Sequence, residues 1–395
     1  MAVIGKRKWR TASGEQREAW KLDFTDVTGE RHREQFAKKK DAEARLQELM
    51  AKTSTGTHRP EGEKKTVRDA AESFIKAMTK RHERGEKVTL TYLNTSRQHC
   101  QNWIDPDGEY VPEKSASGRK LRLKATVFDG GIGDVRLPAL TAKRVIEFRD
   151  AMRDAGAGVV TTRRVLGTLS RILKHAVEQD MVTTNVAKGV RVIGTRDEGP
   201  EKVTPPSKAA LASILTEADD KTKLMIQFAA SSGLRASEQW ALRWRHVDLD
   251  AKTITVESRV DIYGGFDTTK SNAGQRTVRL GQKMADALAT HKEASSYKSD
   301  DDFVFADSKG GFTRHTNMLK RKWNPLTKKV GQAGLGWHSL RHFAISTWIE
   351  AGLQPKAVQT LAGHATFAIT MNRYGHLFPS DDHQDVFDKV AETLA

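Results

Sequence analysis

Four short segments in the second half of the chain carry side chains able to act together on a phosphate group. Guanidinium groups bind phosphate oxygens through forked, charge-assisted hydrogen bonds. A tyrosine hydroxyl, with a pKa of about 10, attacks phosphorus when a proton acceptor and positive charge lie nearby. The segments are residues 233–238 (Gly-Leu-Arg-Ala-Ser-Glu), 268–276 (Thr-Thr-Lys-Ser-Asn-Ala-Gly-Gln-Arg), 337–342 (Trp-His-Ser-Leu-Arg-His) and 361–364 (Leu-Ala-Gly-His), the last followed by Tyr374.

The elements that must position these side chains are mostly helical. Arg235 and Glu238 are three residues apart, as are His338 and Arg341, so each pair shares one face of a helix. The glycine turn at residue 233 is expected to open a helix that continues through residues 240 and 242. A polar turn between strand-like residues 253–256 and 277–280 places Lys270 at or near a hairpin tip, and a short helix is expected between residues 364 and 374.

The upstream half shows two further patterns. Period-two alternation predicts a strand over residues 19–24, a second strand after the turn at residues 28–29, and a helix over 40–52. Residues 66–190 read as mostly helical, interrupted by a loop rich in glycine, proline and charge. Their expected helices include residues 67–78, 141–152 and 161–179, the loop covers 105–134, and the expected linkers cover 53–65 and 193–207.

Composition narrows the class of protein. The chain of 395 residues has 66 Lys and Arg against 50 Asp and Glu, a net charge of +16 that suits a polyanionic partner. Cys100 is the single cysteine, which excludes an internal disulfide framework and a cysteine-based zinc site. No stretch approaches the roughly 18 apolar residues of a membrane span. We therefore expect a soluble intracellular protein with two or three domains and no membrane contact.

Taken in order, the residues Arg, Lys, His-x-x-Arg, His and Tyr resemble the tyrosine recombinase, or phage integrase, family. The resemblance covers nearly all of the last domain, and it implies a site built from six side chains supported by Glu238. These six are Arg235, Lys270, His338, Arg341, His364 and Tyr374.

The implied chemistry assigns a role to each residue. Arg235 and Arg341 would clamp the non-bridging oxygens, and His364 would donate a hydrogen bond to the phosphate. His338 is our candidate base for Tyr374, and Lys270 our candidate acid for the leaving 5′ oxygen. The product is a 3′-phosphotyrosine bond that retains the phosphodiester energy, so neither a metal nor any other cofactor is expected.

The resemblance also implies a domain order and a fold class. We expect an α+β multidomain protein: a small N-terminal β-sheet-plus-helix domain that binds arm-type DNA (residues 1–58), a helical core-binding domain (66–192), and a mainly helical catalytic domain with a small antiparallel sheet (205–395). Four basic residues of the middle domain suit contacts with DNA phosphates, although a solvated helix face explains each one equally well. They are Arg163, Arg164, Arg171 and Lys174.

The implied function is integration and excision of a phage or genomic island in a bacterial nucleoid. Double-stranded attachment-site DNA, a homotetramer on synapsed DNA, an excisionase and DNA-bending proteins are the implied partners. Residues 385–395 show helical spacing, and we hypothesise that they dock on a neighbouring protomer. A chromosome-dimer resolvase and a catalytically dead DNA-binding regulator are the alternatives. Zinc binding by His338 and His342, four residues apart, is disfavoured because Ser339 replaces the glutamate of the metalloprotease motif.

Overall fold

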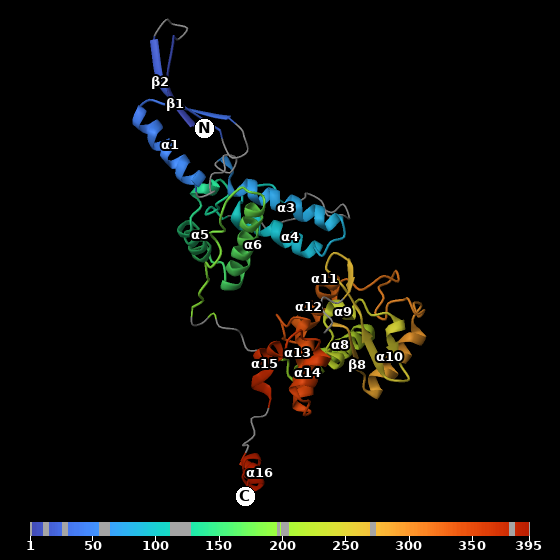
Figure 1. The fold of residues 1–395 in the computed structure, drawn as a ribbon. Helices are drawn as coiled ribbons and strands as arrows, with labels where there is room; N and C mark the ends of the chain where they lie inside the picture. Colours follow the sequence, from blue (N-terminus) through green and yellow to red (C-terminus); the bar gives the residue numbers. More distant parts are fainter. Residues whose placement is uncertain are drawn as a thin grey trace. The chain divides into compact units, whose positions relative to one another are not determined.

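A computed structural model describes residues 2–10, 16–25, 31–54, 64–110, 128–195, 198, 205–268, 274–378 and 384–394. The chain divides into two compact units, residues 1–199 and 200–395. Figure 1 shows the elements of each unit, coloured along the sequence. The domain boundaries expected from the sequence stay a prediction, and most of both expected linkers lies outside the described residues.

The first unit begins with a three-stranded antiparallel sheet in the order β1-β2-β3, covered by one helix (Figure 1). Leu22 and Phe24 of β2 are buried together with Leu49 of the helix, as the alternation over residues 19–24 predicts. The sequence did not indicate β1. The elements are β1 (Ala2–Arg10), β2 (Gln16–Thr25), β3 (Arg31–Phe36) and α1 (Lys39–Ser54).

The rest of the first unit is helical and has its own apolar core. Thr66 and Asp69 form a reciprocal capping box that fixes the start of α3. The expected helices are all present. The elements are α3 (Val67–Glu83), α4 (Leu90–His99), the π-helical turn η1 (Cys100–Ile104), the 3₁₀ turn η2 (Leu137–Ala139), α5 (Ala142–Asp154) and α6 (Val159–Glu178).

The expected loop over residues 105–134 has packed ends, while residues 111–127 lie outside the described part. Asp105 is 1% exposed and accepts two hydrogen bonds, of 2.7 and 2.8 Å, from the guanidinium of Arg68. It also accepts one of 2.6 Å from the hydroxyl of Tyr110. Phe128 and Ile132 join the helical core. The loop ends are thus anchored by the ion pair between Arg68 and the buried carboxylate of Asp105 and by apolar side chains.

The second unit is mainly helical around a core rich in tryptophan. Its helix α9 is only one turn long, so the helix expected to run through residues 240 and 242 is shorter than predicted. The described helices and helical turns are α7 (Lys208–Glu217), α8 (Asp220–Ser232), α9 (Ala236–Gln239), η3 (Trp244–His246), α10 (Gln282–Ala294), α11 (His315–Met318), η5 (Leu319–Trp323), α12 (Asn324–Lys329), α13 (His338–Glu350), α14 (Pro355–Ala362), α15 (Phe367–Tyr374), η6 (Gly375–Leu377) and α16 (Gln384–Leu394).

Two small antiparallel sheets complete this unit. One has the order β4-β5-β8 and the other pairs β6 with β7. The strand-like residues 253–256 and 277–280 correspond to β5 and β8, which do pair, but β6 and β7 come between them in the chain. Lys270 follows β7 and lies outside the described residues. The strands are β4 (Val247–Asp248), β5 (Thr253–Val256), β6 (Ser258–Val260), β7 (Phe266–Thr268) and β8 (Arg276–Arg279).

The observed architecture is the expected α+β multidomain fold, with the larger share of the residues in helices and small antiparallel sheets beside them. Within the described ranges, none of the helices combines the length and apolar character needed to cross a membrane.

Candidate active site

Glu238 is the buried centre of a charge network that holds two arginines. Its carboxylate accepts a hydrogen bond of 2.7 Å from Nη1 of Arg235 and one of 2.8 Å from Nη2 of Arg276. A further bond of 2.9 Å comes from the backbone N–H of Arg235, which caps the short helix α9. Burial raises the pKa of Glu238, but the two arginines and these hydrogen bonds outweigh it and hold the pKa at about 2. The carboxylate is therefore charged at neutral pH.

Arg276 connects three of the four chemistry-bearing segments. Besides its bond to Glu238, its Nε donates to the carbonyl of Leu361 at 2.7 Å, and its Nη1 donates to the carbonyl of Gly274 at 3.1 Å. It is 7% exposed and begins β8, the strand that follows the Lys270 segment. No role was predicted for Arg276 from the sequence. Its alternation with buried Val278 on β8 was the available signal.

Arg341 lies on the first turn of α13 and is 2% exposed. Its Nη1 donates to the carbonyl of Gly233 at 2.6 Å, and its Nη2 donates to the carbonyl of Ala362. Burial, and then the charge of Arg235, lower the pKa of Arg341 to about 9, so the group still carries its charge at neutral pH. The bonds orient the guanidinium from two sides.

His364 follows the helix end at Gly363, whose carbonyl accepts a bond of 2.9 Å from Arg235. The His364 ring is 6% exposed, its Nδ1 lies 2.9 Å from the Thr370 hydroxyl, and it stacks on the ring of Tyr374 with centroids 6.2 Å apart. Burial and the neighbouring arginines, Arg341 first, lower the pKa of His364 to about 3. The ring is neutral at physiological pH.

Tyr374 is the last residue of α15, and its side chain is fully buried. Its hydroxyl lies 2.5 Å from Nδ1 of His342. Burial raises the pKa of Tyr374 to about 12 although Arg341, Arg373 and Arg235 act to lower it. Burial, with Arg373 and Arg341 nearby, lowers the pKa of His342 to about 4. At neutral pH the tyrosine therefore keeps its proton and the histidine is neutral.

His338 lies beside this pair. Its ring meets the His342 ring edge-on, with centroids 4.7 Å apart. Desolvation by the surrounding protein, and then the charges of His342 and Arg341, lower the pKa of His338 to about 4, although part of the side chain still reaches solvent. His338 as the base for Tyr374 stays a prediction.

Five of the six predicted site residues thus gather in the second unit, together with Glu238. The sixth, Lys270, lies outside the described residues. The sequence reasoning considered His342 only as a zinc ligand and missed its contact with Tyr374. His342 directly follows Arg341 and lies on the same helical face as His338, and this position could have indicated that it belongs to the site. Across the described ranges, no group of three or more His, Cys, Asp or Glu side chains is arranged to hold a metal ion.

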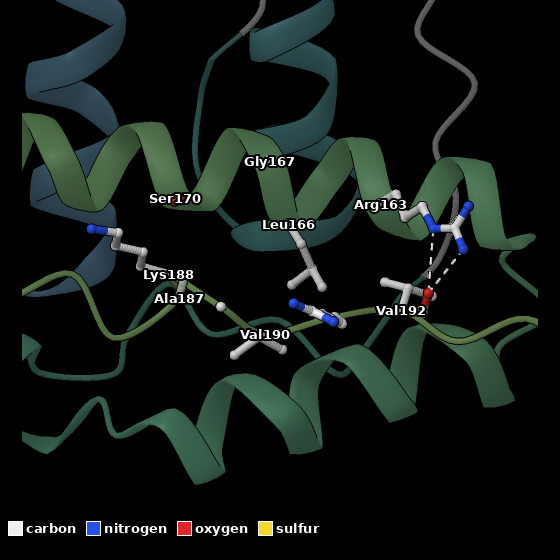
Figure 2. Close-up of a pocket in the computed structure, with 10 residues that line it drawn as sticks. Arg163, Leu166, Gly167, Ser170, Ala187, Lys188, Val190 and Val192 are labelled. Atoms are coloured by element: carbon white, nitrogen blue, oxygen red, sulfur yellow. Dashed lines mark hydrogen bonds between the residues drawn. The ribbon is translucent and has the colours of Figure 1, made fainter.

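The four basic residues predicted on the middle domain all lie on the exposed face of α6, with different partners. Arg163 donates to the carbonyl of Val192 at 3.0 and 3.3 Å, beside a cavity of about 500 Å³ that Lys188 and Arg191 also line (Figure 2).

Arg171 donates to Thr168 at 2.9 Å, and Lys174 pairs with a glutamate one turn later. Arg164 shares the face of Arg171.

Comparisons with known proteins point to one family. Residues 207–381 match the model described as "Phage integrase family". The prophage integrase IntR of Escherichia coli (strain K12) is 24% identical over 241 residues, which are 56% of this chain and 58% of that relative. The ICEBs1 integrase of Bacillus subtilis (strain 168) is 22% identical over 266 residues, which are 65% and 72% of the two chains.

Solved structures share the fold. The integrase of transposon Tn1549, in complex with a circular intermediate DNA, superposes with a TM-score of 0.58 at 17% identity, over 82% of this chain and 99% of that one. A lambda integrase tetramer bound to a Holliday junction gives 0.54 at 15% identity, over 91% and 95%. The second unit therefore carries the domain of the tyrosine recombinase, or phage integrase, family over residues 207–381. Sequence similarity to integrases extends over 56% to 65% of the chain.

Proposed function

We propose that this protein cleaves and rejoins double-stranded DNA through a 3′-phosphotyrosine bond to Tyr374, and so integrates and excises a mobile element. The observation that carries the proposal is that Arg235 and Arg341 bond to the carbonyls of residues 363 and 362, directly before His364, whose ring stacks on Tyr374. Positive charge next to a tyrosine hydroxyl is what attack on a phosphodiester requires.

Arg235 and Arg341 form the phosphate clamp in this proposal. A guanidinium has five N–H donors. The side-chain bonds described above use two nitrogens of each arginine, so donors remain for phosphate oxygens. The side chain of Arg235 is 38% exposed, which makes it the one of the pair that DNA reaches first. Glu238 orients Arg235, and His364 donates to the bound phosphate.

The proton steps complete the proposed mechanism. Lys270 protonates the leaving 5′ oxygen, and a histidine beside Tyr374 accepts the phenolic proton, with His338 as the candidate from the sequence. Because Tyr374 is fully buried, a phosphate reaches its hydroxyl only after a local movement that uncovers it. DNA binding and exposure of the nucleophile are therefore coupled in this proposal.

The upstream parts are proposed to hold the DNA. The face of the β1-β2-β3 sheet opposite α1 carries four basic residues, Arg7, Lys21, Arg31 and Arg33, beside Asp23, which pairs with Lys21 and Arg33. This surface keeps an excess of positive charge, which suits an arm-type site. Exposed Arg164, Arg171 and Lys174 on α6 suit phosphate contacts of a core-binding domain. The corresponding domain limits are residues 1–58, 66–192 and 205–395.

The proposed assembly is a homotetramer on two synapsed attachment sites. The Tn1549 integrase with circular intermediate DNA and the lambda integrase tetramer on a Holliday junction support it by similarity of fold. An excisionase and DNA-bending proteins would set the direction of the reaction. Because the proposed reaction acts on chromosomal DNA, the proposed location is the nucleoid of a bacterial host.

A nicked suicide substrate tests the function, because loss of the short cleaved strand traps the covalent adduct. We expect wild type to form the adduct in EDTA, Tyr374→Phe to form none while binding the same DNA, and Tyr297→Phe to behave as wild type. A wild-type protein that binds the DNA without forming an adduct would instead be a regulator. An adduct with Tyr374→Phe would exclude Tyr374 as the nucleophile.

A further inference from the structure

His342 forms a hydrogen bond with Tyr374, although the family motif assigns no role to His342. Nδ1 of His342 lies 2.5 Å from the Tyr374 hydroxyl, and the two rings are tilted with centroids 5.8 Å apart. His342 is partly buried on α13, directly after the clamp residue Arg341. The helix that aims the arginine therefore also fixes the contact with the nucleophilic oxygen.

The two acidities set the protonation states of this pair. The pKa of Tyr374 is raised to about 12 by burial, and that of His342 is lowered to about 4 by burial and by Arg373 and Arg341. Without DNA, the proton therefore stays on the tyrosine and the imidazole is neutral, and in the tautomer with its proton on Nε2 the Tyr374 O–H donates to the lone pair of Nδ1. The hydroxyl is held in one orientation and has an acceptor in place.

We propose that His342 is a catalytic residue that orients the Tyr374 hydroxyl and receives its proton during attack. The inference deepens the proposed function and rests on it. As the bond between Oη and phosphorus forms, the phenolic proton moves to Nδ1 of His342, and the bond between phosphorus and the 5′ oxygen breaks. The leaving oxygen takes a proton from Lys270. In the rejoining step, Lys270 takes the proton back from the attacking 5′ hydroxyl, and His342 returns its proton to the Tyr374 oxygen.

The bound phosphate supplies the driving force for this transfer. In the free protein, the cationic groups facing His342 are Arg341 and Arg373, with His338 edge-on and Tyr374 opposite. A phosphate on Arg235 and Arg341 adds negative charge close to His342, and nearby opposite charge favours the protonated imidazole. His342 therefore becomes basic only when the substrate is in place, and His338 remains beside it, partly open to solvent.

The test measures single-turnover adduct formation on the nicked substrate with two leaving groups. A 5′-bridging sulfur leaves as a thiolate, since a thiol has a pKa of about 8.5, and so needs no acid. We expect His342→Leu to slow adduct formation about 10²–10⁴-fold with either leaving atom, the usual contribution of general-base catalysis. Lys270→Ala should be slow with oxygen and close to wild type with sulfur. His376→Leu, an exposed histidine just after Tyr374, is the matched control.

A second variant separates proton transfer from folding. In His342→Asn the amide oxygen takes the place of Nδ1, so the hydrogen bond is kept but the proton is not accepted. We expect a loss of at least about 10²-fold for this variant too. Its rate should also lack the fall at acidic pH that protonation of Nδ1 causes in wild type. Half-site binding and thermal unfolding identify a variant that has lost its fold.

The outcomes distinguish the two proposals. No adduct with wild type would refute the proposed function itself. An active wild type together with a folded His342→Asn variant of unchanged rate and pH profile would overturn the role of His342. A loss with both leaving atoms in His338→Asn, but not in His342→Asn, would assign the proton to His338 instead.

Discussion

At the scale of single residues, the site concentrates positive charge around one buried carboxylate. Arg235 and Arg276 both bond to Glu238, and Arg341 lies close enough for the charges of all three to affect its pKa. Like charges packed together destabilise a fold unless a counter-charge is buried with them. Glu238 supplies that counter-charge. Because one carboxylate faces three arginines, the network keeps a net positive charge, which would attract a phosphate.

Replacing Glu238 with glutamine should expose this dependence. Removal of one member of a buried ionic network leaves the other charges unpaired, and we expect the free energy of unfolding to fall by about 3–5 kcal/mol at pH 7. The folded-state pKa of Glu238 is about 2, lowered from 4.5. Its contribution is therefore fully present above about pH 4.5 and is lost as the pH falls toward 2.

Urea unfolding, followed by tryptophan fluorescence at pH 6 and pH 3, measures both effects. The gap between wild type and Glu238→Gln should narrow at the lower pH. Asp286→Asn on the exposed face of α10 is a control that should show no such gap. A gap of equal size at both values would mean that the charge of Glu238 does not stabilise the fold.

The sequence indicated residues that the fold brings together, but it did not indicate the groups that these residues contact. Residue types and order were enough to indicate Arg235, Arg341 and Tyr374. The contacts of His342 and Arg276 depend on which groups the fold brings beside them. His342 contacts Tyr374, which is 32 positions away in the sequence, and Arg276 contacts Glu238, which is 38 positions away. Such partners follow from tertiary packing, which local spacing does not contain.

At the scale of elements, two helix C-termini hold the arginines. α8 ends at Gly233 with φ of +62°, and α14 ends at Gly363 with φ of +65°. Both are left-handed caps that favour glycine and turn the chain sharply. Carbonyl groups at these ends accept bonds from Arg341 and Arg235, and the negative ends of the helix dipoles favour the cations.

Gly233→Ala tests this arrangement. A β-carbon at this position would lie 2.6 Å from the Trp348 ring, in addition to the strain of a positive φ. We expect a loss of about 2–4 kcal/mol in the free energy of unfolding, from left-handed strain of about 1–2 kcal/mol and steric repacking. Adduct formation should fall as well, because the Gly233 carbonyl orients Arg341.

The matched control is Gly352→Ala, which has φ of +88° but no atom within 4 Å of the added carbon. It should lose only the strain energy, about 1–2 kcal/mol, and keep its adduct rate. Equal losses of stability and rate in the two variants would show that Trp348 and the carbonyl contact are unimportant.

Elements were predicted well where one face is consistently apolar. The helices α3, α5 and α6 and the strand β2 follow clear periodicities. The strand β1 was missed because Lys6 follows Ile4 on the face toward α1, so no period-two pattern is visible. Lys6 is satisfied there by an ion pair with Glu18 on β2, at 2.8 Å.

At the scale of the whole molecule, positive charge extends over both units. The chain carries +16, and basic side chains lie on the β1-β2-β3 sheet, on α6 and in the candidate active site. A protein that contacts DNA phosphates from several parts releases many counterions, so its affinity falls steeply with salt. The test is to measure the affinity for attachment-site DNA at salt concentrations from about 50 to about 200 mM. When Arg164 and Arg171 are both replaced by glutamine, the affinity should fall less steeply with salt than in wild type, because two phosphate contacts are removed.

The C-terminal helix α16 presents an apolar surface suited to contact between protomers. Phe387 is 69% exposed and Val390 is 54% exposed, three residues apart on one helical face. Large exposed apolar side chains at this spacing are typical of a face that packs on a partner, and the proposed tetramer offers a second copy of this chain. Deletion of residues 384–395 should therefore weaken tetramer formation on attachment DNA and leave binding to a single half-site unchanged.

Size-exclusion chromatography with light scattering on attachment-site duplexes measures the assembly, and a gel-shift titration measures half-site binding. Phe387→Glu together with Val390→Glu should reproduce the deletion, because the charges cannot be buried without a partner. Lys389→Glu, a charge change on the same helix, is the control and should still assemble. Full tetramer formation by the deleted protein would refute the contact. Loss of half-site binding would show instead that α16 supports the fold of its own chain.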